Sequence, residues 1–161
     1  MGENVILIAG LPGSGKTTHL CRISRDGWRV FDDYKAEGPD LMFRSSPRLG
    51  DLIGALRAGF KCAVADIDFC RTRSREEAEL VLFEEIRDLR LRWCFFDNDP
   101  SACEANIRRR NRSCLQDELR YLREYSPSYS IPQGADVLPV TAQNADRRET
   151  ENWELRTENC F

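Results

Sequence analysis

A glycine-rich stretch near the N-terminus contains the residues best suited to chemistry. The phosphate-binding pattern G-x-x-x-x-G-K-S/T is matched at every fixed position by Gly10-Leu11-Pro12-Gly13-Ser14-Gly15-Lys16-Thr17. Glycines let successive main-chain N–H groups turn inward, where they can donate hydrogen bonds to phosphate oxygens. The residues expected to bind the phosphates of a nucleotide are Gly10, Pro12, Gly13, Ser14, Gly15, Lys16, Thr17 and Thr18.

Two side chains of this stretch have expected roles in phosphoryl transfer. The ammonium of Lys16 would reach the β- and γ-phosphates as a catalytic residue, and the Thr17 hydroxyl would ligate magnesium. The alternative is a plain strand–turn–helix with glycines in its turn, but the complete motif favours the phosphate site. The only histidine, His19, is expected to be a surface or packing residue rather than a base.

Aspartates follow the second and third expected strands, at residues 28–31 and 61–65. Asp32 could accept the proton of an attacking hydroxyl, and Asp33 would lie beside it on the acceptor side. Asp66 is the expected magnesium ligand, directly or through water, with Asp68 two residues further on. The alternative roles are a turn or helix cap for the first pair and a solvated loop for the second.

Arginines suited to binding phosphate groups occur in two places. Arg71 and Arg73 could hold an anionic acceptor, although a solvated helix start explains them equally well. A second group, in the stretch ANIRRRNRSC, could bring guanidinium groups to the transferring phosphate from a mobile segment. Its candidate catalytic residues are Arg108, Arg110 and Arg112. The alternative for this group is a basic surface helix paired with Glu104 or Glu118.

Alternating strands and helices must position these groups. Strands are predicted at residues 5–9, 28–31, 61–65, 92–96 and 136–140. Helices are predicted at residues 16–24 and 115–125. Three more are predicted from their N-caps: from Ser46 to residue 58, from Ser74 to residue 90 and from Asp99 to residue 111. This order predicts an α/β fold with a five-stranded parallel sheet, whose carboxyl edge collects the loops described above.

Composition excludes several classes of protein. The chain has 161 residues, 41% of them hydrophobic, and a net charge of -3, which argues against non-specific nucleic-acid binding. No apolar run reaches the roughly 18 residues that span a bilayer, so no membrane partner is expected. The seven cysteines lack metal-ligand spacing and follow no export signal, which predicts a cytoplasmic protein with mostly buried thiols.

Together these motifs resemble those of small P-loop kinases, above all the kinase domain of phage-type polynucleotide 5′-hydroxyl kinases. Adenylate-kinase-like and zeta-toxin-like kinases are the next families in similarity. The family's D-D-Y-R appears as D-D-Y-K, which implies Asp32 as general base and Lys35 as a contact to the acceptor phosphate. The resemblance also implies ATP and magnesium as cofactors, Asp66 at the third strand, and a three-layer αβα fold with an arginine-bearing lid around Arg110-Asn111.

The resemblance covers residues 5–140, so residues 1–140 are expected to form the P-loop kinase domain. Residues 141–161 turn polar and charged and are expected to form a tail, docked by Trp153.

The function predicted from these features is transfer of the γ-phosphate of ATP, with magnesium, to a hydroxyl acceptor. The preferred acceptor is a nucleic-acid 5′-hydroxyl end or a nucleotide-like molecule. A small metabolite such as a sugar, an antibiotic or a nucleoside is the alternative acceptor. A rival from another class is an ATP-binding switch or assembly module that works through a partner; the sequence does not indicate an oligomeric state.

Overall fold

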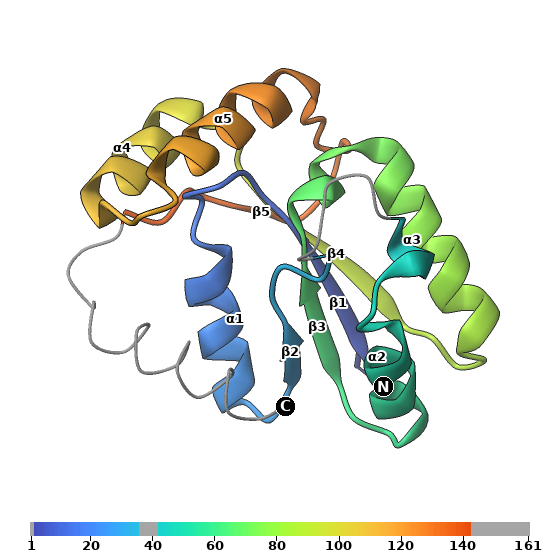
Figure 1. Ribbon diagram of the computed structural model, residues 1–161. Helices are drawn as coiled ribbons and strands as arrows, with labels where there is room; N and C mark the ends of the chain where they lie inside the picture. The colour runs from blue at the N-terminus through green and yellow to red at the C-terminus, as the bar shows by residue number, and fades with distance from the viewer. Residues whose placement is uncertain (1, 36–41, 143–161) are drawn as a thin grey trace.

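A parallel sheet of five strands is the centre of the fold. The computed structural model describes residues 2–35 and 42–142. Its strands are β1 (Val5–Ala9), β2 (Arg29–Phe31), β3 (Cys62–Ala65), β4 (Leu91–Phe96) and β5 (Val137–Leu138). They pair in parallel in the order β2-β3-β1-β4-β5, which puts the strand before the glycine-rich stretch in the middle (Figure 1).

Helices cover both faces and the carboxyl end of this sheet. The α-helices are α1 (Lys16–Arg25), α2 (Leu49–Arg57), α3 (Thr72–Glu85), α4 (Pro100–Arg110) and α5 (Leu115–Tyr125). Short 3₁₀ helices are η1 (Phe43–Ser45), η2 (Ile67–Cys70) and η3 (Ser126–Ser128). In Figure 1, α1 lies on one face, α2 and α3 lie on the other, and α4 and α5 lie across the carboxyl ends of the strands. Within the described residues, no helix is both long and apolar enough to cross a membrane.

The continuous apolar run of β1 is what a strand covered on both faces requires. All five of its residues are buried. Val5 and Leu7 belong to the larger core cluster, which includes residues of α2 to α5, whereas Ile6 and Ile8 belong to the smaller cluster with Leu20 of α1. Because side chains alternate along a strand, β1 separates these two cores and anchors the loop that follows it.

The sequence predicts the order of elements correctly, but two helix caps are wrong. Ser46 does not cap α2: its hydroxyl donates to the Tyr34 carbonyl (2.7 Å), and the helix begins at Leu49. Ser74 lies inside α3, which begins at Thr72 because the chain leaves η2 through an extended Arg71. The same helix ends at Glu85 rather than near residue 90, where Ile86 becomes extended and turns into the core.

The predicted cap of α4 is confirmed. Asp99 precedes Pro100, and its carboxylate accepts a hydrogen bond from the Ala102 amide (3.0 Å). The thiols also agree with the prediction of mostly buried cysteines. The free cysteines within the described residues are the buried Cys21, Cys62, Cys70, Cys94 and Cys103 and the exposed Cys114.

Replacing Asp99 tests how strongly this cap stabilises α4. Asp99→Ala should lower the free energy of unfolding by about 1 kcal/mol, because an orphan amide of the first turn loses its acceptor. Asp99→Asn keeps the acceptor and should remain within about 0.5 kcal/mol of the wild type. Urea unfolding followed by circular dichroism measures both, and equal stability of all three proteins would contradict a stabilising cap.

Candidate active site

The glycine-rich loop of residues 10–17 lies between β1 and α1 and approaches neighbouring main chain closely. Gly13 and Gly15 have positive φ angles of 80° and 110°. A Cβ on Gly13 would lie 2.4 Å from the carbonyl oxygen of Cys103 in α4, and one on Gly15 would lie 2.9 Å from Thr141 Oγ1. Both positions therefore need glycine for conformation and for space.

Asn106 of α4 holds this loop in place. Its Nδ2 donates to the carbonyls of Gly13 (2.9 Å) and Thr141 (2.8 Å), and the Thr141 amide donates to the Ser14 carbonyl (3.1 Å). The loop, α4 and the segment after β5 are thus joined by main-chain acceptors and one buried side chain. Sequence reasoning missed Asn106, because an asparagine within a basic helix gives no local signal of such a role.

Polar groups in and beside the loop fit a polyphosphate. Ser14 Oγ is buried and has no hydrogen-bond partner among the described residues. Lys16 Nζ donates to the carbonyls of Gly10 (2.6 Å) and Leu11 (3.1 Å), so its ammonium lies across the loop. Helix α1, with Thr17 and Thr18 in its first turn, begins here and adds the positive end of its dipole. An orphan hydroxyl, an ammonium and a helix N-terminus together suit a multiply charged anion.

Asp32 is the carboxylate that contacts the loop. Its Oδ2 accepts a hydrogen bond from Thr17 Oγ1 (2.7 Å), and its Oδ1 accepts one from the Asp33 amide (3.0 Å). Burial and the charge of Asp33 raise the pKa of Asp32, while the hydroxyl of Thr17 and the ammonium of Lys16 oppose that rise. A carboxylate with a raised pKa beside a phosphate site is suited to accepting a proton.

Asp66 occupies a different environment, although it also lies at the carboxyl edge. Its Oδ2 accepts from the Lys35 amide (2.8 Å) and its Oδ1 from the Asp68 amide (2.9 Å), so both oxygens bind main chain. Burial raises its pKa to about 6. The magnesium role of Asp66 stays a prediction, and in this structure Asp32 is the aspartate hydrogen-bonded to Thr17.

A magnesium site here would depend on the nucleotide. Within residues 2–35 and 42–142, no three His, Cys, Asp or Glu side chains gather as a metal site. Magnesium in kinases is held by one or two carboxylates together with substrate phosphates, so such a cluster is not needed. The Thr17 hydroxyl and the carboxylates of Asp32 and Asp66 are the groups that could complete its coordination.

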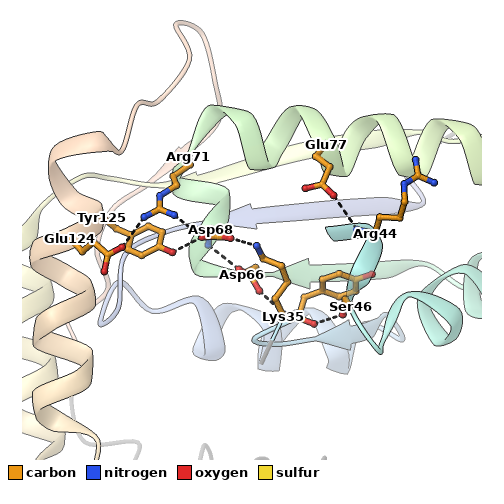
Figure 2. Close-up of polar contacts among 10 residues, drawn as sticks. Lys35, Arg44, Ser46, Asp66, Asp68, Arg71, Glu77, Glu124 and Tyr125 are labelled. Carbon is orange, nitrogen blue, oxygen red and sulfur yellow. Dashed lines mark hydrogen bonds and ion pairs between the residues drawn. The ribbon is translucent and has the colours of Figure 1, made fainter. Parts of the chain in front are cut away.

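Two of the four predicted acceptor contacts lie in an ion-pair network (Figure 2). Lys35 is buried and its Nζ pairs with the carboxylate of Asp68, while Arg71 pairs with Glu124 (2.8 Å). Asp33, with a positive φ of 44°, and Arg73 are exposed. Contact with the acceptor stays a prediction for all four, and for Lys35 and Arg71 the structure shows internal partners.

The predicted lid arginines lie on and after α4. Arg108 pairs with Glu104 one turn earlier (2.6 Å) and is exposed. Arg110 pairs with Glu118 of α5 (2.9 Å) and is largely covered, which links the two helices. Arg112 is exposed in the short connection between them. The structure thus brings the three arginines to the connected ends of α4 and α5, and their catalytic role stays a prediction.

Arg48 is a residue at this edge that sequence reasoning missed. It precedes α2, and its Nη1 donates to the carbonyl of Asp32 (2.5 Å). Ser46, two residues earlier, donates to the carbonyl of Tyr34. The segment before α2 thus holds the turn after β2, and the only local signal was a serine–proline pair interpreted as a helix cap.

Comparisons with known proteins agree with this architecture. No protein-family model matches the chain. Over 134 residues it is 29% identical to an uncharacterised protein of Acanthamoeba polyphaga mimivirus, a match covering 81% of this chain and 89% of that protein.

Several solved structures with the same architecture are kinases of different substrates. A sugar kinase from Janibacter has a TM-score of 0.60 at 14% identity, covering 98% of this chain and 95% of that one. A gluconokinase from Sinorhizobium meliloti has a TM-score of 0.53 at 13% identity, covering 96% of this chain and 97% of that one. A fungal RNA kinase has a TM-score of 0.55 at 12% identity, covering 98% of this chain and 85% of that one. The chain therefore has the α/β fold of small P-loop kinases.

Alanine at Gly13 tests the close approach of the loop to α4. Gly13→Ala and Gly27→Ala both place alanine at a positive φ, 80° and 82°, which costs roughly 1–2 kcal/mol each. Only the Gly13 methyl also overlaps the Cys103 carbonyl, since nothing lies within 4 Å of one on Gly27. Urea unfolding should show an additional loss of about 1–3 kcal/mol for Gly13→Ala. Equal losses for the two variants would contradict the packing described.

Proposed function

We propose that this protein is a kinase that uses ATP and magnesium to phosphorylate a hydroxyl acceptor. The observation that carries the proposal is the hydrogen bond between Asp32 and Thr17, which places a carboxylate directly against a complete phosphate-binding loop. A phosphate loop alone suits any nucleotide-binding protein, whereas a carboxylate at that position can serve an acceptor hydroxyl. The fold shared with kinases of sugars, gluconate and RNA supports the same class of reaction.

Each group of the site has a defined role in the proposed transfer. The loop amides and Lys16 bind the β- and γ-phosphates and neutralise charge that develops on their oxygens. Asp32 accepts the proton of the acceptor hydroxyl as its oxygen bonds to the γ-phosphorus and the bond to the β–γ bridging oxygen breaks. The side chains of Thr17 and Asp66 would hold magnesium, which supplies positive charge to the phosphate oxygens.

Arginines complete the proposed site from the lid. Arg108, Arg110 and Arg112 lie at the connected ends of α4 and α5, and α4 also binds the phosphate loop through Asn106. A small movement of this helix pair would bring guanidinium groups toward the transferring phosphate. The exposed Arg108 can leave Glu104 readily, whereas Arg110 would exchange its largely covered pair with Glu118 for the phosphate.

The charges on the acceptor side favour a small hydroxyl compound. Lys35 and Arg71, the basic residues predicted to contact the acceptor that have internal partners, are balanced by Asp68 and Glu124. A nucleic-acid end is held mainly through its phosphates and needs unbalanced positive charge, which a net charge of -3 does not supply. A nucleic-acid 5′-hydroxyl remains the second candidate, because the D-D-Y-K stretch and the similarity to a fungal RNA kinase favour it.

Asp32→Asn distinguishes a kinase from a nucleotide-binding switch. Loss of the proton acceptor should lower phosphoryl transfer about 10²–10⁴-fold, while ATP binding changes little because asparagine keeps an oxygen that can accept the Thr17 hydrogen bond. Asp136→Asn, at an exposed position immediately before β5, is the matched control and should transfer phosphate normally. Single-turnover transfer from γ-labelled ATP and calorimetric ATP binding give the two values. Normal transfer by Asp32→Asn would contradict the proposed base.

A panel of acceptors tests the preference for small hydroxyl compounds. Sugars, sugar acids and nucleosides should be labelled by γ-labelled ATP more efficiently than a 5′-hydroxyl oligonucleotide, with Lys16→Ala as the inactive control. Raising the salt concentration should change the rate little, because few acceptor phosphates are neutralised. Preferred labelling of the oligonucleotide, with a steep loss of rate in salt, would establish the second candidate instead.

A further inference from the structure

The turn that carries Asp32 has an unusual backbone held by its neighbours. Asp33 has a φ of 44°, in the left-handed region that few residues other than glycine adopt. The following amides are bound across to the end of β3: that of Tyr34 to the Ala65 carbonyl (3.1 Å) and that of Lys35 to Asp66. A conformation of this kind persists where several contacts fix it together.

The side chain of Lys35 is the far anchor of this turn. It pairs with Asp68, and the two side chains are only 7% and 4% exposed. Removing charges from water is costly, and a buried pair is tolerated when further hydrogen bonds satisfy it. The position of Lys35, three residues after Asp32, therefore depends on what holds Asp68.

Asp68 is held by groups from two other elements (Figure 2). Its Oδ1 accepts a hydrogen bond from the Tyr125 hydroxyl (2.5 Å) and lies 3.6 Å from Arg71 Nη1. Its amide donates to Asp66, so its own backbone is fixed at the end of β3. One carboxylate thus joins the turn after β2 to the start of α3 and to the end of α5.

Helix α5 connects this carboxylate to the lid. Tyr125 is the last residue of α5 and is fully buried, and the guanidinium of Arg71 lies 4.2 Å from the centre of its ring. Near the first turn of the same helix, Glu118 pairs with Arg110 of α4. Helix α5 therefore links the lid arginine at one end to Asp68 at the other, and through Lys35 to the turn of Asp32.

We infer that Asp68 and Tyr125 are positioning residues, which set the place of Asp32 relative to the lid without touching the acceptor or the nucleotide. The inference rests on the proposed function, because it assigns these residues a role through the catalytic use of Asp32. The Tyr125 hydroxyl, the Asp68 carboxylate and the Lys35 ammonium form one chain from the lid helix to the catalytic turn. Loss of any member leaves the nucleotide site intact and displaces the base.

Tyr125→Phe tests the chain with the smallest possible change. It keeps the buried ring and removes only the hydroxyl that binds Asp68. We expect kcat to fall roughly tenfold to hundredfold, as displacements of about 1 Å at a reacting group do, while KM for ATP stays within about twofold because the phosphate loop is unaltered. Tyr121→Phe, one turn earlier on α5 and only partly buried, is the matched control and should keep the wild-type kcat.

A double variant keeps the test valid if single changes unfold the protein. Lys35→Met/Asp68→Asn removes both charges of the buried pair at nearly constant side-chain volume and keeps an oxygen that can accept from the Tyr125 hydroxyl, so little stability should be lost. The thermal midpoint should therefore hold while kcat falls as in Tyr125→Phe. The conservative Lys35→Arg keeps the charge and should restore more activity than Lys35→Met alone.

The outcomes separate this inference from the proposed function. A wild-type protein that transfers phosphate to no acceptor overturns the proposed function, and this inference with it. An active wild type, with kcat of Tyr125→Phe and of the double variant within about twofold of it, overturns the positioning role alone. The role is also overturned if kcat and ATP affinity decline together with the folded fraction, because that pattern indicates a structural contribution only.

Discussion

The close approach between the phosphate loop and α4 is the constraint on which the rest of the site depends. At Gly13 the two main chains come so near that a single methyl group would overlap the Cys103 carbonyl. That proximity lets one side chain, Asn106, hydrogen-bond the loop and the segment after β5 at once. The loop, α4 and the segment after β5 are consequently one unit, so any movement of α4 would also move the loop.

Buried carboxylates dominate the other side of the site. Asp66 and Asp68 are both buried next to the half-buried Asp32, and each has a different set of partners: a hydroxyl for Asp32, main-chain amides for Asp66, and a lysine with a tyrosine for Asp68. These environments give the three carboxylates different roles, because of the three only Asp32 is hydrogen-bonded to a side chain of the phosphate loop. Because Asp68 and Glu124 pair with Lys35 and Arg71, these basic residues are neutralised within the protein, which favours an acceptor without phosphates of its own.

Features determined by neighbours in sequence could be predicted, and those determined by distant residues could not. The loop of residues 10–17, the α/β order and the Asp99 cap depend on local spacing, and the structure contains all three. The interpretation of Lys35 as an acceptor contact did not include its pairing with Asp68, 33 residues away, or Tyr125 beyond it. Asn106 and Arg48 escaped notice for the same reason, since their partners are main-chain carbonyls that no sequence pattern marks. The cap predicted at Ser74 failed because the preceding 3₁₀ turn starts the helix two residues earlier.

Every role proposed for the site requires that the loop of residues 10–17 binds the phosphates of a nucleotide. Isothermal titration calorimetry of the wild-type protein with ATP and with adenosine, in the presence of magnesium, tests it most directly. We expect saturable binding of ATP and little heat from adenosine, since the loop would contact phosphate oxygens and the base would add less. Equal binding of the two compounds, or no binding of ATP at millimolar concentration, would contradict it.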